Sequence, residues 1–97
     1  MTIYTKENLI RVDSYVEEYF KYAENLSKEY NINEIAVESL KRIFKCFPND
    51  EELYLSYEID NAKSKKINSF LKVPILFDFE KYNYYLQRFG EYKNEVK

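Results

Sequence analysis

The sequence predicts one small α+β domain over residues 1–97, in which a mostly antiparallel sheet of about three strands packs against two to three helices. Apolar residues make up 45% of the 97-residue chain, which contains one Gly and two Pro, so a core can form and disorder is excluded. Stretches with an apolar residue at every third or fourth position are interspersed with stretches in which apolar and polar residues alternate. No repeat or linker divides the chain into smaller units.

The first expected element is an amphipathic helix over residues 9–30. Apolar residues recur there in steps of three and four, and Thr5 is a suitable N-cap. An alternative remains open, because the Tyr, Val and Phe residues of this segment favour strands. In that alternative, residues 15–22 and 28–32 form a hairpin that turns near residues 24–25. We expect the helix.

A second helix is predicted from about Glu34 to Cys46. Asn33 precedes it as a candidate N-cap, and the apolar residues that follow keep helical spacing until Pro48 prevents continuation. Cys46 lies beside the apolar stripe of this helix. Because no histidine is present to activate the thiol, we expect Cys46 to be inert and at least half-buried.

A half-buried strand is predicted over residues 53–59, after a turn at residues 48–50. Apolar and polar residues alternate strictly in this segment. The residues expected to point inward are Leu53, Leu55, Tyr57 and Ile59.

The remaining segment predicts a short helix and two further strands. Asp60 or Asn61 caps the helix, and Pro74 prevents its continuation. Residues 75–80 alternate and indicate a strand. Residues 82–89 fit either a strand or a helix, and their aromatic content favours a strand.

The composition excludes most kinds of enzyme. The chain has no histidine, which is the commonest general base and the commonest metal ligand. The single cysteine, Cys46, cannot form an internal disulfide or a cysteine-rich zinc site. The single glycine, Gly90, cannot build a glycine-rich phosphate loop. We therefore expect no enzymatic activity, no cofactor, no metal and no small-molecule substrate.

The location expected from the sequence is the cytoplasm. The N-terminal residues lack the basic and apolar segments of a secretion signal. The longest apolar run, residues 73–77, is far shorter than the roughly 20 residues that span a bilayer. We expect no membrane partner.

Charge is distributed in two blocks of opposite sign. Residues 47–60 contain only acidic charged residues, whereas residues 61–72 contain only lysines as charged residues. The chain also contains 11 tyrosines, a residue enriched at protein interfaces. The acidic block is suited to a basic partner. The lysine block is interpreted as a solvated helix face, with a nucleic-acid-binding regulator that uses Lys63–Lys72 as a rival interpretation.

Two segments give the chain a resemblance to a known group of proteins. They are DEELYLSYEI at residues 50–59 and FDFEKYNYYL at residues 77–86. With its small size and acidity, the chain resembles the small bacterial immunity proteins that neutralise contact-dependent growth-inhibition toxins and related polymorphic toxins. The resemblance implies a cytosolic protein that binds the C-terminal domain of its cognate toxin, often a nuclease acting on tRNA, rRNA or DNA, and blocks its active site.

The surface chemistry supplies the candidate contact residues, since the resemblance itself names none. Nuclease sites hold phosphate with Lys and Arg, so carboxylates are complementary to them, and tyrosines are suitable anchors. The candidate partner-binding residues are Asp50, Glu51, Glu52, Tyr54, Glu58, Tyr82, Tyr84 and Tyr85. Reversing the charges of Glu51 and Glu52 is expected to weaken binding. The alternative function is a non-enzymatic adaptor or a self-associating interaction domain.

Overall fold

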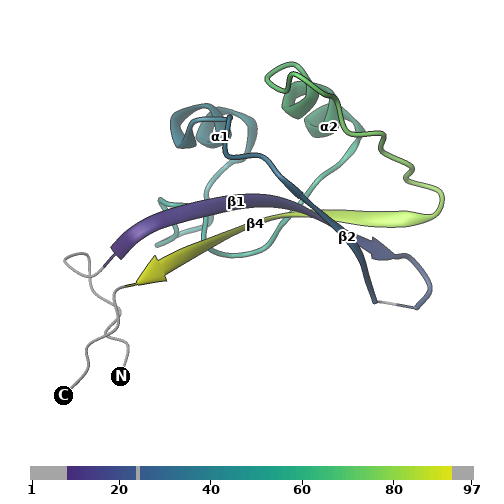
Figure 1. The fold of residues 1–97 in the computed structure, drawn as a ribbon, viewed down its shortest axis with the longest axis horizontal. Coiled ribbons are helices and arrows are strands. Elements are labelled where there is room, and N and C mark those ends of the chain that lie inside the picture. The colour runs from purple at the N-terminus through teal and green to yellow at the C-terminus, as the bar shows by residue number, and fades with distance from the viewer. Residues whose placement is uncertain (1–8, 24, 93–97) are drawn as a thin grey trace.

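A computed structural model describes residues 9–23 and 25–92 and contains one antiparallel sheet with the strand order β2-β1-β4-β3. Two helices lie on the same side of this sheet (Figure 1). The predicted α+β class is confirmed, with four strands in place of about three. The elements are β1 (Leu9–Phe20), β2 (Leu26–Asn31), α1 (Val37–Ile43), β3 (Tyr57–Glu58), α2 (Asn61–Asn68) and β4 (Tyr82–Tyr92).

The helix predicted over residues 9–30 is wrong, and the hairpin alternative is confirmed. β1 and β2 pair in antiparallel fashion, and the Phe20 amide donates to the Asn25 carbonyl at 2.9 Å across the turn. β1 also pairs along its whole length with β4, so that Val16 lies opposite Leu86. Those contacts are distant in sequence, and they outweigh the local helical spacing because the β-branched and aromatic residues pack well on a sheet.

The helix predicted from Glu34 to Cys46 exists as the shorter α1, and Asn33 does not cap it. The Asn33 side chain instead accepts a hydrogen bond from the Ser14 amide and donates one to Asp13, both at 2.7 Å. The helix begins three residues later, after Ala36, which makes no side-chain cap. Asn33 therefore connects the segment that follows β2 to β1.

The strand predicted over residues 53–59 is confirmed only at Tyr57 and Glu58. The carboxylate of Asp50 accepts hydrogen bonds from the amides of Tyr54 and Leu55, at 2.8 and 3.0 Å, and curls this segment into a loop. Leu53 has a φ angle of 59°, which an extended strand does not allow. Leu55, expected inside, is 53% exposed.

The helix after Asp60 is confirmed as α2, while the strand predicted over residues 75–80 is wrong. Asp60 caps α2 by accepting from the Lys63 amide at 2.8 Å. The side-chain amide of Asn68 then accepts from the Ile75 N–H and donates to the Ile75 carbonyl, at 2.8 and 2.9 Å. These bonds satisfy backbone groups that a neighbouring strand would have used. β4 follows as a strand, as predicted.

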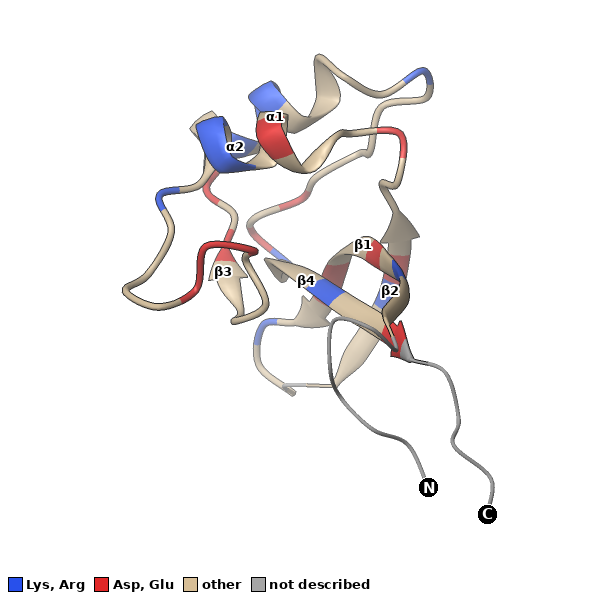
Figure 2. Cartoon of the chain, turned by 90° about the vertical axis from the view of Figure 1, so that its left-hand side faces the viewer, with Lys and Arg blue, Asp and Glu red and all other residues tan. Residues whose placement is uncertain are grey.

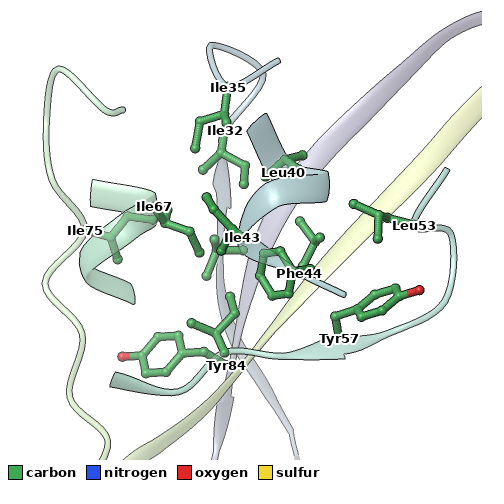
Figure 3. Packing of buried hydrophobic residues seen from close by; sticks show 13 residues of the cluster. Ile32, Ile35, Leu40, Ile43, Phe44, Leu53, Tyr57, Ile67, Ile75 and Tyr84 are labelled. Atoms are coloured by element: carbon green, nitrogen blue, oxygen red, sulfur yellow. The ribbon is translucent and has the colours of Figure 1, made fainter. Parts of the chain in front are cut away.

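The core lies between the helices and one face of the sheet. Ile43 and Phe44 from the α1 region and Ile67 from α2 lie above Tyr84 of β4 (Figure 3). Neither of the two helices in the described part of the chain lies on the opposite face of the sheet (Figure 1). The buried apolar residues are Val16, Ile32, Ile35, Leu40, Ile43, Phe44, Leu53, Tyr57, Ile59, Ile67, Ile75, Tyr84 and Leu86.

Candidate protein-binding surface

Strand alternation divides the side chains of β1 and β4 between the two faces of the sheet. Val16 and Leu86 lie opposite each other and are fully buried under the helices, so their sequence neighbours point to the other side. We call that other side the open face. Its side chains are Asp13, Tyr15, Glu17, Tyr19, Glu29, Asn31, Glu58, Asn83, Tyr85, Gln87 and Phe89.

Aromatic side chains form two contacts between β1 and β4 on the open face. The rings of Tyr15 and Phe89 have centroids 6.0 Å apart, and those of Tyr19 and Tyr85 are 5.7 Å apart in an edge-to-face arrangement. Cross-strand aromatic pairs of this kind each contribute about 0.5–1 kcal/mol to sheet stability. Because the rings are only partly covered, they also offer apolar area to a partner.

Three carboxylates and one phenol form a row across all four strands. Glu29 of β2 lies opposite Glu17 of β1, Glu17 lies opposite Tyr85 of β4, and Tyr85 lies opposite Glu58 of β3. We call these four residues the carboxylate row. With neighbouring strands about 4.8 Å apart, the row is roughly 15 Å long.

No ion pair within residues 9–23 and 25–92 neutralises the carboxylate row. Arg11, the cation at the end of the open face, is bound to Asp13 at 3.2 Å and to Glu91 at 2.8 Å. Lys28 lies opposite Glu18, on the helix-facing side of the sheet, with its ammonium 4.9 Å from the centre of the Tyr30 ring. The three carboxylates of the row therefore have no ion-pair partner among the described residues, and the nearby Lys21 lines a pocket together with Glu58.

Glu17 is the most covered member of the row. Its side chain is 7% exposed, and it accepts a hydrogen bond from the Tyr19 hydroxyl at 2.9 Å. Burial, this hydrogen bond and the charges of Glu17 and Glu29 together raise the pKa of Tyr19. The phenol of Tyr19 thus stays protonated as a donor to Glu17 at neutral pH.

The comparisons with known proteins identify a family and nothing closer. A family model described as a domain of unknown function, DUF7683, matches residues 13–87, which is most of the chain. The chain belongs to the DUF7683 family. The matched segment of this DUF7683 domain contains the entire carboxylate row. No curated protein and no solved structure shows a significant match to the chain.

Two of the residues predicted to face a partner are instead inside the DUF7683 domain. Asp50 is 6% exposed, and its carboxylate accepts from the Tyr57 hydroxyl at 2.6 Å in addition to the two loop amides. Tyr84 is 1% exposed, and its hydroxyl donates to Glu18 at 2.8 Å. This burial corrects the prediction, because both polar groups are fully engaged in holding the fold.

Glu51, Glu52 and Tyr54 lie on the surface, in the loop that precedes β3. The Glu52 carboxylate is 3.3 Å from the Lys41 ammonium and 4.0 Å from the guanidinium of Arg88. Arg88 is buried, donates to Ser14 Oγ at 3.0 Å and lies over the Tyr54 ring. Two of these three predicted contact residues are thus already engaged by Arg88.

The structure brings Glu58 and Tyr85 together and separates Tyr82 from them. Glu58 and Tyr85 are direct cross-strand neighbours on the open face. Tyr82 is half-buried on the helix-facing side, where its ring lies 5.4 Å from that of Phe20.

Sequence reasoning missed Glu17 and Glu29, because both lay inside the expected helix. The strand-favouring Tyr, Val and Phe residues that suggested the hairpin were the available signal, because a strand places Glu17 on the same face as Tyr15 and Tyr19.

The helices of the DUF7683 domain carry the opposite charge to the open face. Lys65 and Lys66 of α2 and Arg42 of α1 are exposed. Figure 2 shows blue segments on both helices, a red segment on α1, where Glu38 is exposed, and red segments on β1 and in the loop before β3. Within the part of the chain that the structure describes, no three acidic, cysteine or histidine side chains gather as metal ligands, and no helix is long and apolar enough to cross a bilayer.

Proposed function

We propose that this protein is a small cytoplasmic immunity protein that binds the C-terminal domain of a cognate toxin and covers its basic active site. The observation that supports the proposal is the carboxylate row, whose three carboxylates form no ion pair with any of residues 9–23 and 25–92. The proposed inhibitor acts by stoichiometric binding and carries out no reaction of its own. The partner is a basic protein, of which a nuclease is the best-fitting kind.

The spacing of the row favours a basic partner. Glu17 and Glu29 face each other directly across two strands, and like charges in that position destabilise a sheet. A cation placed near them relieves the repulsion and gains about 1–4 kcal/mol of Coulomb energy at 4 Å, depending on how much water remains. The same field accelerates the encounter with a positively charged surface.

The surroundings of the row favour a protein over a small ligand. The rings of Tyr15 and Phe89 lie on one side of the row and that of Tyr19 lies on the other, and all three are partly exposed. Partly exposed aromatic rings surrounded by charge are typical anchors of protein interfaces. Carboxylates also accept the hydrogen bonds that nuclease Lys and Arg side chains otherwise make to phosphate, so the row is suited to occupy such a site.

The test uses the C-terminal domain encoded by the gene immediately upstream of the gene for this chain. We expect that domain to stop growth when it is produced alone in bacteria and to be tolerated when this protein is produced with it. The purified pair is expected to form a 1:1 complex with a nanomolar Kd by calorimetry, with an affinity that falls as salt rises. No protection together with no complex at micromolar concentrations overturns the proposal.

A matched pair of double variants tests the role of the row. Glu29→Lys with Glu58→Lys and Glu51→Lys with Glu52→Lys each change the formal net charge from -2 to +2. The first pair is expected to weaken the complex by about 100-fold or more, and the second by less than about tenfold, because only the first lies in the row. Equal losses in affinity contradict a role for the row and indicate that both pairs act through the overall electrostatic field of the molecule.

A further inference from the structure

We infer that a pocket on the open face receives the side chain of one arginine of the partner; this rests on the proposed function and names the contact that anchors it. The pocket has a volume of about 280 Å³ and lies beside the carboxylate row, with Tyr19 and Tyr85 among its lining residues. A space of this size holds one long side chain and leaves the rest of the interface to the open face.

Aromatic residues are among those that line the pocket, including Tyr19 and Tyr85. The edge-to-face contact of Tyr19 and Tyr85 fixes both rings, since each is also in a strand whose neighbours are paired. A guanidinium that lies against a tyrosine ring gains about 0.5–2 kcal/mol from the attraction between the cation and the ring face. Pre-arranged rings lose little conformational entropy when the arginine enters.

Polar groups in the pocket match the donors of a guanidinium. Ser56, Asn83 and Gln87 line it, and each has a side-chain oxygen that accepts hydrogen bonds. A guanidinium has five N–H donors in one plane, whereas an ammonium has three on a compact, strongly hydrated centre. Neutral acceptors combined with flat rings therefore favour arginine over lysine.

Negative charge lies on both sides of Tyr85. Glu17 and Glu58 are its direct neighbours on the two adjacent strands, so a cation beside Tyr85 is attracted from both directions. The cation already present at the pocket, Lys21, donates a hydrogen bond from its ammonium to the Phe79 carbonyl. That hydrogen bond positions the Lys21 ammonium, which keeps its positive charge and also lines a second pocket together with Glu58.

The test titrates isotope-labelled protein with the capped peptide acetyl-Gly-Arg-Gly-amide and follows amide resonances by NMR at low salt. We expect saturable shifts at residues 19, 56, 83 and 85 with a Kd in the millimolar range, as suits a single side chain. The lysine peptide is expected to bind at least about threefold more weakly, and the glutamine peptide to cause no saturable shift. Equal binding of the arginine and lysine peptides, or shifts centred on the helices, overturns the inference.

Three variants locate the binding. Tyr85→Ala is expected to abolish binding of the arginine peptide, and Tyr85→Phe to retain it, because the ring is the contacting group. Tyr22→Ala removes a tyrosine that is fully exposed in the hairpin turn, and it is expected to change nothing. The amide spectrum of each variant reports whether the fold is intact. Unchanged binding by a folded Tyr85→Ala variant contradicts the pocket.

The experiments test the arginine pocket and the proposed function independently. In one outcome, the arginine peptide does not bind while Glu29→Lys with Glu58→Lys still weakens the toxin complex. That result contradicts the arginine pocket and supports binding of the toxin through the open face. If the peptide binds but the upstream domain forms no complex and is not neutralised, the toxin assignment is wrong and the arginine pocket stands.

Discussion

Two carboxylates of this protein are held in the interior mainly by hydroxyl and amide groups. Asp50 accepts from the Tyr57 hydroxyl and from two loop amides, and Glu18 accepts from the hydroxyls of Tyr84 and Ser27 at 2.8 and 2.9 Å. A buried donor left without its acceptor costs about 1–3 kcal/mol, so residues of this kind have a large effect on stability. These two carboxylates therefore stabilise the fold, whereas the carboxylates of Glu29 and Glu58 lie at the surface.

Replacing Asp50 by Ala is expected to lower the free energy of unfolding by about 2–4 kcal/mol at pH 7, because three donors lose their acceptor together. Urea unfolding followed by circular dichroism measures the loss. Glu51→Ala, one residue further along on the surface, is the control and is expected to stay within about 0.5 kcal/mol of the unmodified protein. Equal effects of the two substitutions contradict the structural role of Asp50.

The contribution of Asp50 is also expected to depend on pH. Burial alone raises the pKa of Asp50, but the hydrogen bonds from Tyr57, Leu55 and Tyr54 and the charge of Arg88 together bring it below its ordinary value. The stabilisation is therefore complete above the unfolded pKa of about 3.9 and is lost as the pH falls through the folded value. The difference between Asp50→Ala and the unmodified protein should shrink below pH 4 and stay constant from pH 5 to 8.

At the scale of elements, one tyrosine of β4 joins three parts of the chain. They are β1 of the hairpin, β4 itself and the loop that precedes β4. The hydroxyl of Tyr84 in β4 donates to Glu18 in β1 and accepts from the Asp78 amide at 3.0 Å. Burial is the main reason why the pKa of Tyr84 is raised far above its ordinary value, although the Asp78 amide lowers it and the hydrogen bond and charge of Glu18 raise it further. A neutral hydroxyl is thus retained where three elements meet.

Tyr84→Phe is expected to destabilise the protein by about 1–3 kcal/mol, since Glu18 loses a donor and the Asp78 amide loses its acceptor. Tyr82→Phe removes a hydroxyl from the neighbouring half-buried ring and serves as the control, with an expected change below about 0.5 kcal/mol. Thermal unfolding at pH 7 separates the two variants. A Tyr84→Phe protein as stable as the control shows that the hydroxyl is not needed.

At the scale of the whole molecule, the small net charge conceals two surfaces of opposite sign. The open face carries the carboxylate row, and the helices on the other side of the sheet carry exposed Lys65, Lys66 and Arg42. Such an arrangement orients the molecule in the field of a charged partner before contact. It also concentrates repulsion on the open face while that face is unoccupied.

Glu29→Gln is therefore expected to stabilise the free protein by about 0.2–1 kcal/mol in low salt, because it removes the repulsion with Glu17 directly opposite. In 1 M NaCl, where screening acts over about 3 Å, the gain should largely disappear. Urea unfolding at the two salt concentrations measures both effects, with Glu51→Gln as the control. Destabilisation by Glu29→Gln, or a gain independent of salt, contradicts the repulsion within the row.

The parts predicted correctly from the sequence are those controlled by neighbours along the chain. The Asp60 cap and the helix α2 that follows it lie within one short segment, and β4 is marked by its aromatic residues. Glu58 and Tyr85 were placed in strands for the same reason, because alternation and aromatic content mark their segments, and their contact with a partner stays a prediction. The burial of Asp50 could not be predicted, since it depends on how a loop closes around one carboxylate.

The sequence by itself determined the α+β class, the helix after Asp60 and the separation of acidic from basic segments, because these follow from local spacing and composition. Only the tertiary structure decided that residues 9–31 form a hairpin and that Glu17 and Glu29 join Glu58 in one row. The physical reason is the pairing of β1 with β4, where Val16 meets Leu86. Contacts between segments so far apart in the chain override local helical periodicity, and they alone determine which side chains share the open face.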